Sequence, residues 1–321
     1  MPSFLAEACA TPSMVRLQDV GMHCGLEYTS YPYFAKVGAY SRFAHSVGVA
    51  MIAYHFSKDR SQAFAGLYHD IATPCFSHVV DFLQGDHERQ ESTEEATRAM
   101  IQSDPKNLEN LSKSQLDLEE VADYHAYPIC DNDSPRLSAD RLEYTLANFL
   151  HFNLTSQAEA QSFYDDLIVA QNEDGQPEIA FQSPELAHRF GLLMMKNADM
   201  YTRKEDRYAM EMASRLLNSA LKEGIIGKDD LYGTERELIQ KLVGSKLASA
   251  WKDFARLNLV TTSPLPGKEP FFFGSIMTKK RWIDPLVLHR GRLSAIDKEF
   301  ADEVSAFLAL SFDETLFGYG E

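Results

Sequence analysis

Two neighbouring segments, residues 42–57 and 61–71, constrain the fold of this chain most, because each carries apolar residues at helical spacing. In the first segment Phe43, Val47 and Met51 fall on one helical face. The connection between the two segments is only a few residues long. The pattern therefore predicts two antiparallel helices that pack against each other through their apolar faces.

Most of the remaining chain shows the same helical periodicity. We expect further helices at 77–83, 88–100, 138–152 with Ser138 as N-cap, 184–223 with breaks, 228–243, 246–257 and 296–310, and an irregular polar segment at 102–117. Two β-prone runs flank the turn sequence NEDGQP and predict a hairpin near 165–181, and short strands are expected near 270–290. The sequence thus predicts a mainly α fold, a helical bundle with small β accessories.

The chain length of 321 residues is compatible with one to three domains. We expect a helical domain over 1–258, with the hairpin as an insertion, and a C-terminal α/β accessory segment over 259–321 packed on it. The aromatic run at 271–273 is consistent either with a core position or with a surface for self-association.

The formal net charge of −16 argues against a nucleic-acid partner, because an acidic surface repels polyanions. A local arginine cluster can still bind a small phosphate over short distances. The cysteines are widely spaced and form no CxxC pair, which favours buried free thiols over disulfides. The sequence shows neither a signal-peptide pattern nor a transmembrane-length apolar run, so we expect a cytoplasmic protein without a membrane partner.

The adjacent pair His69 and Asp70 in an apolar helix calls for a compensating partner, because an unpaired buried charge is costly. Together with His45 and Asp140, the pair offers two imidazoles and two carboxylates. This donor set suits one divalent transition metal, Mn²⁺, Fe²⁺, Co²⁺, Ni²⁺ or Zn²⁺, with Mg²⁺ as a further candidate. The alternatives are a hydrogen-bonded core histidine and a helix-dipole role for Asp140, in which case Asp199 is the replacement ligand.

Five stretches of the chain carry a resemblance to a known family. They are RLQDVG (16–21), SRFAHSVGVA (41–50), GLYHDIATPCFSH (66–78), SADRLEYTLAN (138–148) and DMYTRKEDRYAMEMASRLL (199–217). In this order they resemble motifs of the HD-domain phosphohydrolase superfamily, whose signature is H…HD…D. The flanking residues are most similar to the branch that contains deoxynucleoside triphosphate triphosphohydrolases, over roughly residues 14–245.

The resemblance implies an HD helical bundle and a set of site residues. The implied metal ligands are His45, His69, Asp70 and Asp140. The implied substrate contacts are Arg42, Arg141 and Arg203 to phosphates, Tyr144 to the sugar, and His23 at the place of a substrate-recognising glutamine. Guanidinium groups suit the phosphate role because they form bidentate, charge-assisted contacts. Arg207 is a weaker candidate for the same role, and the alternative for each arginine is an ion pair at the surface.

The implied catalytic residues are Asp70, as a metal-binding carboxylate, and His78, as the acid that protonates the leaving oxygen. His87 is either an acid–base partner beyond the metal or an ordinary surface residue. A site for two metals would need both His87 and His125, although their spacings match that arrangement poorly.

The motifs also depart from the family pattern. Ala72 and Thr73 replace a glycine and a histidine that often assists catalysis, and Asn148 stands where an aspartate contacts the sugar. We expect a metal-dependent phosphohydrolase that acts on a nucleotide, with a (deoxy)nucleoside triphosphate favoured because one phosphate would not require three arginines. The alternatives are a non-catalytic nucleotide sensor and a phosphatase for another small phosphorylated molecule. The resemblance also implies a homo-oligomer.

Overall fold

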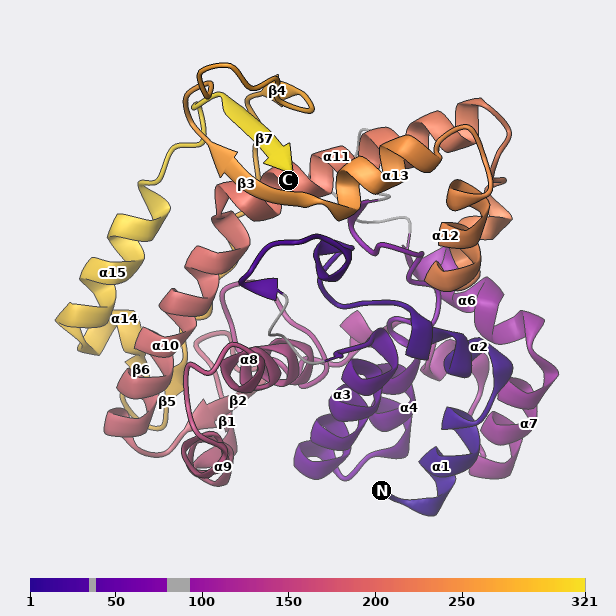
Figure 1. The fold of residues 1–321 in the computed structure, drawn as a ribbon. Coiled ribbons are helices and arrows are strands. Elements are labelled where there is room, and N and C mark those ends of the chain that lie inside the picture. Colours follow the sequence, from indigo (N-terminus) through magenta and orange to yellow (C-terminus); the bar gives the residue numbers. More distant parts are fainter. Residues whose placement is uncertain (35–38, 80–92, 321) are drawn as a thin grey trace.

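The computed structural model describes residues 1–34, 39–79 and 93–320, and helices dominate it (Figure 1). The helices are α1 (Ser3–Cys9), α2 (Pro12–Val15), α3 (Arg42–Ser57), α4 (Arg60–Tyr68), α6 (Thr93–Ser103), α7 (Pro105–Ser114), α8 (Ala139–His151), α9 (Gln157–Asp165), α10 (Pro184–Thr202), α11 (Lys204–Lys222), α12 (Glu235–Val243), α13 (Ala248–Ala255), α14 (Leu293–Ile296) and α15 (Lys298–Leu308). The strands are β1 (Leu167–Gln171), β2 (Pro177–Phe181), β3 (Leu257–Thr261), β4 (Phe273–Gly274), β5 (Leu286–Val287), β6 (Gly291–Arg292) and β7 (Leu316–Gly320). The predicted mainly α class with small β accessories is confirmed.

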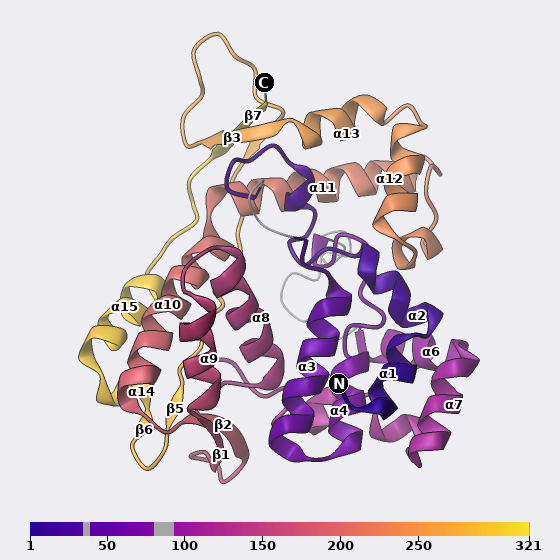
Figure 2. The same cartoon turned by 60° about the horizontal axis from the view of Figure 1, so that its bottom comes forward.

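Helices α3 and α4 form the predicted antiparallel pair (Figures 1 and 2). Helix α3 begins where the Ser41 side chain accepts a hydrogen bond from the backbone N–H of Ala44, and it ends at Lys58 in the left-handed conformation. Asp59 then caps α4 by accepting from the backbone N–H of Ser61. Two caps and one left-handed residue therefore reverse the chain within a few positions.

Helix α8 packs against α3 and completes the frame of the site. The predicted N-cap is confirmed, since the Ser138 side chain accepts a hydrogen bond from the backbone N–H of Arg141. The opposite side of α8 contributes Phe149 to the largest apolar core cluster. In that cluster the ring centroid of Phe190 lies 5.5 Å from Phe149 and 5.1 Å from Phe181. Aromatic contacts of this kind contribute about 0.5–1.5 kcal/mol each beyond burial.

The small sheets connect the C-terminal part of the chain to the helical part. Strands β1 and β2 form the predicted hairpin, with Leu167 opposite Phe181. Strand β5 joins β2 in parallel, so the sheet order is β1-β2-β5-β6. A second sheet has the order β3-β7-β4, and Figures 1 and 2 show it beside α11 and α13, at the end of the molecule farthest from the hairpin.

Several predicted boundaries are wrong. Residues 102–117 contain α7, which begins at Pro105 because Asp104 accepts from the backbone N–H of Lys106, and which buries Leu111. The run 257–261 forms a strand because it pairs with the C-terminal residues 316–320, a contact that local periodicity does not reveal. The expected helix 77–83 and the start of the expected helix 88–100 lie largely outside the described residues.

The cysteines are Cys9, Cys24, Cys75 and Cys130, and all four are buried free thiols, as predicted. Within the described ranges, no helix combines the length and the apolar character that crossing a membrane requires.

Candidate metal centre

Helices α3 and α4 bring two histidines to the same point. The Nε2 atoms of His45 and His69 lie 3.2 Å apart. The carboxylate of Asp70 approaches both, with Oδ2 3.5 Å from Nε2 of His69 and 3.9 Å from Nε2 of His45. Ligand atoms of the three residues all lie within 4.8 Å of one another, a spacing that one metal ion can bridge.

Helix α8 adds Asp140 to this cluster. Its Oδ1 lies 3.0 Å from Nε2 of His45 and 3.8 Å from Nε2 of His69. The structure thus brings together all four ligands that the sequence predicts. Asp199, the alternative ligand, is instead exposed on α10, where its Oδ2 lies 3.6 Å from Nε of Arg203.

The second ring nitrogen of each histidine is already engaged. Nδ1 of His69 lies 2.7 Å from the carbonyl oxygen of Gly66, so Nδ1 must carry the proton. Nδ1 of His45 contacts the carboxylate of Glu143, which also accepts a hydrogen bond from the Tyr40 hydroxyl. Both Nε2 atoms therefore face the cluster with lone pairs available when the rings are neutral, the arrangement typical of metal-binding histidines.

Glu143 is a functional residue that the sequence motifs did not indicate. It lies one helical turn after Asp140, which places the two carboxylates on one face of α8. Gly48 on α3 makes room for it, because a Cβ added at Gly48 would lie 2.5 Å from Cγ of Glu143. The available sequence signal was Gly48, because a glycine in the interior of a predicted helix indicates close approach of another group.

Acidic groups set the charge of the cluster. Burial lowers the pKa of His45, but Glu143 and Asp140 outweigh burial and raise this pKa to about 10. Burial likewise raises the pKa of Asp140, yet the hydrogen bond and charge of His45 bring it well below its usual range. In the metal-free protein a proton on His45 therefore balances the carboxylates, and a divalent cation can replace it.

Arg42 orients the carboxylate of Asp70 and keeps it ionised. Its Nη1 lies 2.8 Å from Oδ2 of Asp70, and its Nε donates to the Ser77 hydroxyl at 3.1 Å. Burial raises the pKa of Asp70, but Arg42, followed by the nearby histidines, holds it far below its usual range. Asp70 therefore stays ionised and presents oxygen atoms to the cluster.

Residues distant in sequence hold the turn after Asp70. Arg16, from the RLQDVG stretch, donates to the carbonyl oxygens of Ile71 (2.6 Å) and Thr73 (2.8 Å). Glu235, from α12, accepts from the backbone N–H of Phe76 at 2.9 Å. Phe76 itself adopts a φ of 61°, a left-handed conformation that these contacts help to hold.

A cavity of about 730 Å³ opens at the cluster. Of the predicted site residues, those that line it are Arg42, His69, Asp70, His78, Asp140, Arg141 and Tyr144. Arg141 is already bound, because its Nη1 lies 2.9 Å from Oδ1 of Asp131 and its Nε donates to the carbonyl of Arg136. The volume suits a small organic ligand.

Arg203 and His23 do not line this cavity. Arg203 stacks over the ring of Tyr33, 5.1 Å from its centroid. His23 lies among aromatic rings, and its Nε2 is buried without a hydrogen-bond partner in the described part of the chain. His87 lies outside the described residues, so its role stays a prediction. His125 lines the cavity, but its Nδ1 lies 2.8 Å from Oδ2 of Asp131 and it is not part of the ligand cluster that the described residues form.

Arg207 forms an ion pair, but its guanidinium lies inside the protein and not at the surface, as the alternative had predicted. Its side chain is buried, donates to the carbonyl oxygen of Ile276 at 2.7 Å, and pairs with Glu314. These partners connect α11 to the C-terminal segment and leave no free edge of the guanidinium toward a substrate.

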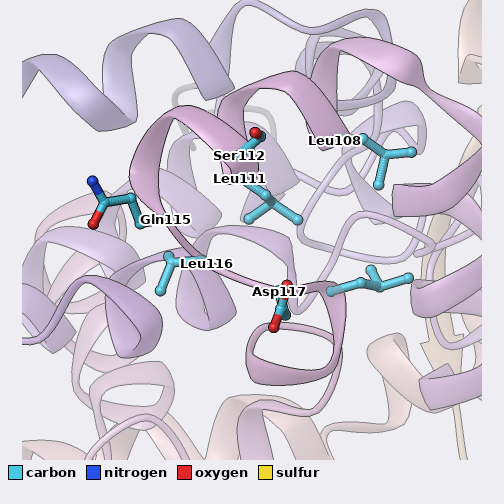
Figure 3. A pocket seen from close by; sticks show the side chains of 7 residues that line it. Leu108, Leu111, Ser112, Gln115, Leu116 and Asp117 are labelled. Atoms are coloured by element: carbon cyan, nitrogen blue, oxygen red, sulfur yellow. The ribbon is translucent and has the colours of Figure 1, made fainter.

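A second hollow lies beside the C-terminal end of α7. Figure 3 shows its lining residues Leu108, Leu111, Ser112, Gln115, Leu116 and Asp117. One carboxylate among apolar and neutral side chains supplies neither a metal donor set nor a phosphate-binding group. The chemistry of the described residues is therefore concentrated at the α3–α4–α8 cluster.

The donor set fits a divalent transition metal. It combines two imidazole nitrogens whose tautomers are fixed with two carboxylates that stay ionised. Mixed nitrogen and oxygen ligands of this kind suit Mn²⁺, Fe²⁺, Co²⁺, Ni²⁺ or Zn²⁺.

Comparison with known proteins agrees with this geometry. Residues 42–142 match the family model described as "HD domain", a range that includes all four ligands. The chain is 29% identical over 208 residues to the uncharacterized protein YdhJ of Bacillus subtilis, covering 64% of this chain and 62% of that protein. It is 26% identical over 127 residues to the metal-dependent phosphohydrolase cns2 of Cordyceps militaris, covering 40% of this chain and 36% of that protein.

The chain thus spans less than two thirds of the length of either relative. The part of this chain that is similar to an HD domain, residues 42–142, contains the cluster of His45, His69 and Asp70.

Proposed function

We propose that this HD-domain protein hydrolyses a phosphoester of a nucleotide, with a (deoxy)nucleoside triphosphate as the favoured substrate. The observation that carries the proposal is the convergence of His45, His69, Asp70 and Asp140 beside a cavity. Its lining includes His69, Asp70 and Asp140 together with arginine and tyrosine side chains. A cavity of about 730 Å³ can admit a nucleotide.

The four ligands would hold one divalent ion. When bound, such an ion polarises a phosphoryl oxygen and makes water a stronger nucleophile at neutral pH. Arg42 keeps Asp70 ionised and oriented through their 2.8 Å contact. Glu143 keeps the Nε2 atom of His45 directed at the cluster. These contacts preorganise the site, so that little rearrangement accompanies substrate binding.

His78 is the proposed proton donor for the leaving oxygen. It lines the same cavity as His69 and Asp70. The ordinary pKa of a histidine, about 6.5, suits an acid that works near neutral pH. Thr73, where the family has a second histidine, donates its hydroxyl to Oδ1 of Asp70 at 2.7 Å and supports the ligand instead. We therefore assign the acid role to His78 alone among the described histidines.

Product analysis tests this function. Purified protein loaded with Mn²⁺ is incubated with a panel of nucleoside mono-, di- and triphosphates, and the released anions are separated by ion chromatography. We expect one equivalent of metal per chain and release of intact triphosphate. Release of orthophosphate instead would identify a phosphatase with a different substrate.

Variants assign the roles. Asp140→Ala should lose both metal and hydrolysis, whereas Asp229→Ala, an exposed aspartate, should lose neither. His78→Ala should keep the metal and slow hydrolysis by about 100-fold or more, and His55→Ala, on the exposed end of α3, serves as its control. Full activity in His78→Ala would refute the proton-donor role.

A non-catalytic nucleotide sensor is the second candidate, and Thr73 in place of the family's histidine is the observation that favours it. Bound metal without hydrolysis of any panel member would contradict nucleotide hydrolysis and would favour either this sensor or a different phosphorylated substrate.

A further inference from the structure

A short C-terminal segment, residues 279–282, reaches the cavity of the metal cluster. Lys279, Lys280, Arg281 and Trp282 all line it, although they follow the last metal ligand by more than a hundred positions. The segment belongs to residues 259–321, which carry none of the motifs that predict the site. Three consecutive cations at a cavity wall stand out on a chain with a net charge of −16.

Two arginines that were expected to bind phosphate already form ion pairs with aspartates. Arg42 forms an ion pair with Asp70 at 2.8 Å, and Arg141 forms one with Asp131 at 2.9 Å. Both pairs are largely buried, so the guanidinium charges are matched before any substrate arrives. These arginines can position an anion, but they add little net positive charge to the cavity.

Two further cations at the wall are also engaged. Arg136 pairs with the acidic residues 173–174 in the turn of the hairpin. Lys280 donates to the carbonyl oxygens of Leu308 (2.5 Å) and Leu310 (2.6 Å), which holds the segment against the end of α15. Lys280 therefore anchors the segment and presents its neighbours to the cavity.

Lys279 and Arg281 differ from these four cations. Neither forms a hydrogen bond or an ion pair with any residue in the described ranges 1–34, 39–79 and 93–320. Burial, and after it the positive charges of Arg281 and Arg141, lower the pKa of Lys279. Asp206 is an acidic group within electrostatic reach of Arg281, but burial raises its pKa to about 8. The two cations thus repel each other at a wall where an anion would relieve the repulsion.

We propose that Lys279 and Arg281 bind a second anionic group of the substrate, a phosphate other than the one attacked at the metal cluster. The inference deepens the proposed function and rests on it: the substrate is then a small molecule with at least two phosphates. A lysine and an arginine side by side offer charge-assisted hydrogen bonds to several phosphate oxygens. The residues 259–321 would then contribute directly to substrate recognition.

Calorimetry with inorganic anions tests this inference without turnover. Metal-free protein is titrated with inorganic triphosphate and, separately, with orthophosphate. We expect wild-type protein to bind triphosphate more tightly than orthophosphate. The double variant Lys279→Ala/Arg281→Ala should weaken triphosphate binding at least tenfold, about 1.4 kcal/mol, with a much smaller effect on orthophosphate.

The matched control is Lys252→Ala/Arg290→Ala, which removes the same charge from exposed positions outside the cavity lining. It should bind triphosphate like wild type. Lys279→Gln/Arg281→Gln provides a second, less disruptive variant, and circular dichroism establishes that each variant is folded.

Unchanged triphosphate affinity in both cavity variants would overturn the inference, and so would an equal loss in the control variant. Because the readout is binding to metal-free protein, it stays interpretable if the product analysis finds no hydrolysis. Failure of the proposed function and failure of this inference are therefore distinguishable.

Discussion

Replacing Glu143 with glutamine should weaken metal binding, although Glu143 is not itself one of the four ligands. Glu143 accepts hydrogen bonds from Nδ1 of His45 and from the Tyr40 hydroxyl. The side chains of His45 and Glu143 are only 1% and 13% exposed, so solvent cannot substitute for the lost charge. Glutamine keeps the shape of the side chain and removes its negative charge.

The magnitude follows from the partners. Hydrogen bonds that orient a metal-binding histidine are worth about 10- to 100-fold in metal affinity. This range corresponds to about 1.4–2.7 kcal/mol. Glu143 also raises the pKa of His45, so a metal ion must displace a proton from this histidine in the wild type. In Glu143→Gln this proton is held less tightly. Below the pKa of His45, this difference offsets part of the loss in metal affinity. We therefore expect the largest effect at high pH.

Competition with a fluorescent chelator gives the affinity directly. Metal-stripped wild type, Glu143→Gln and the control Glu185→Gln, an exposed residue on α10, compete for Mn²⁺ or Zn²⁺ at several pH values. The control should match wild type throughout. An affinity of Glu143→Gln within twofold of wild type at every pH would refute the argument that this carboxylate orients His45.

Three further predictions concern the same frame. Gly48→Ala should lower metal affinity in the same chelator assay. The added Cβ would lie 2.5 Å from Cγ of Glu143, which is too close, and would push this side chain away from His45. Wild-type affinity in the variant would contradict this prediction. In metal-free protein, the stability that protonated His45 contributes is fully present below about pH 6.5 and is lost as the pH rises through about 10, so the Tm should fall over that interval; a Tm that rises there would be inconsistent with a raised pKa. Arg207→Ala should destabilise the protein by about 1–3 kcal/mol in urea unfolding, because it leaves the carbonyl oxygens of Thr202 and Ile276 without their buried guanidinium donor; a loss below about 0.5 kcal/mol would argue against this role.

Local sequence patterns were enough for the frame of the site. The helical spacing of residues 42–57, the N-cap at Ser138 and the turn sequence of the hairpin each depend on neighbours a few positions away. The donor chemistry of two histidines and two aspartates, together with the resemblance to HD-domain proteins, predicted the four ligands, and the structure brings them close together. The surrounding support was not predictable in this way.

Glu143 illustrates one limit. On a helix its charge is compatible with an exposed face, and only the packing of α8 against Gly48 turns it toward His45. The segment 279–282 illustrates another, because its approach to the cavity depends on pairing of β5 with β2 and on contacts of Lys280 with the end of α15. Contacts between residues this far apart in sequence leave no local periodicity.

One titration tests the central claim, that His45, His69, Asp70 and Asp140 hold a single ion on which hydrolysis depends. Metal-stripped protein receives Mn²⁺ in fractions of an equivalent, and hydrolysis of a nucleoside triphosphate is measured after each addition. The account predicts that activity rises linearly and saturates at one equivalent per chain, and that Asp140→Ala stays inactive throughout. Hydrolysis that is independent of added metal, or that persists in Asp140→Ala, would contradict it.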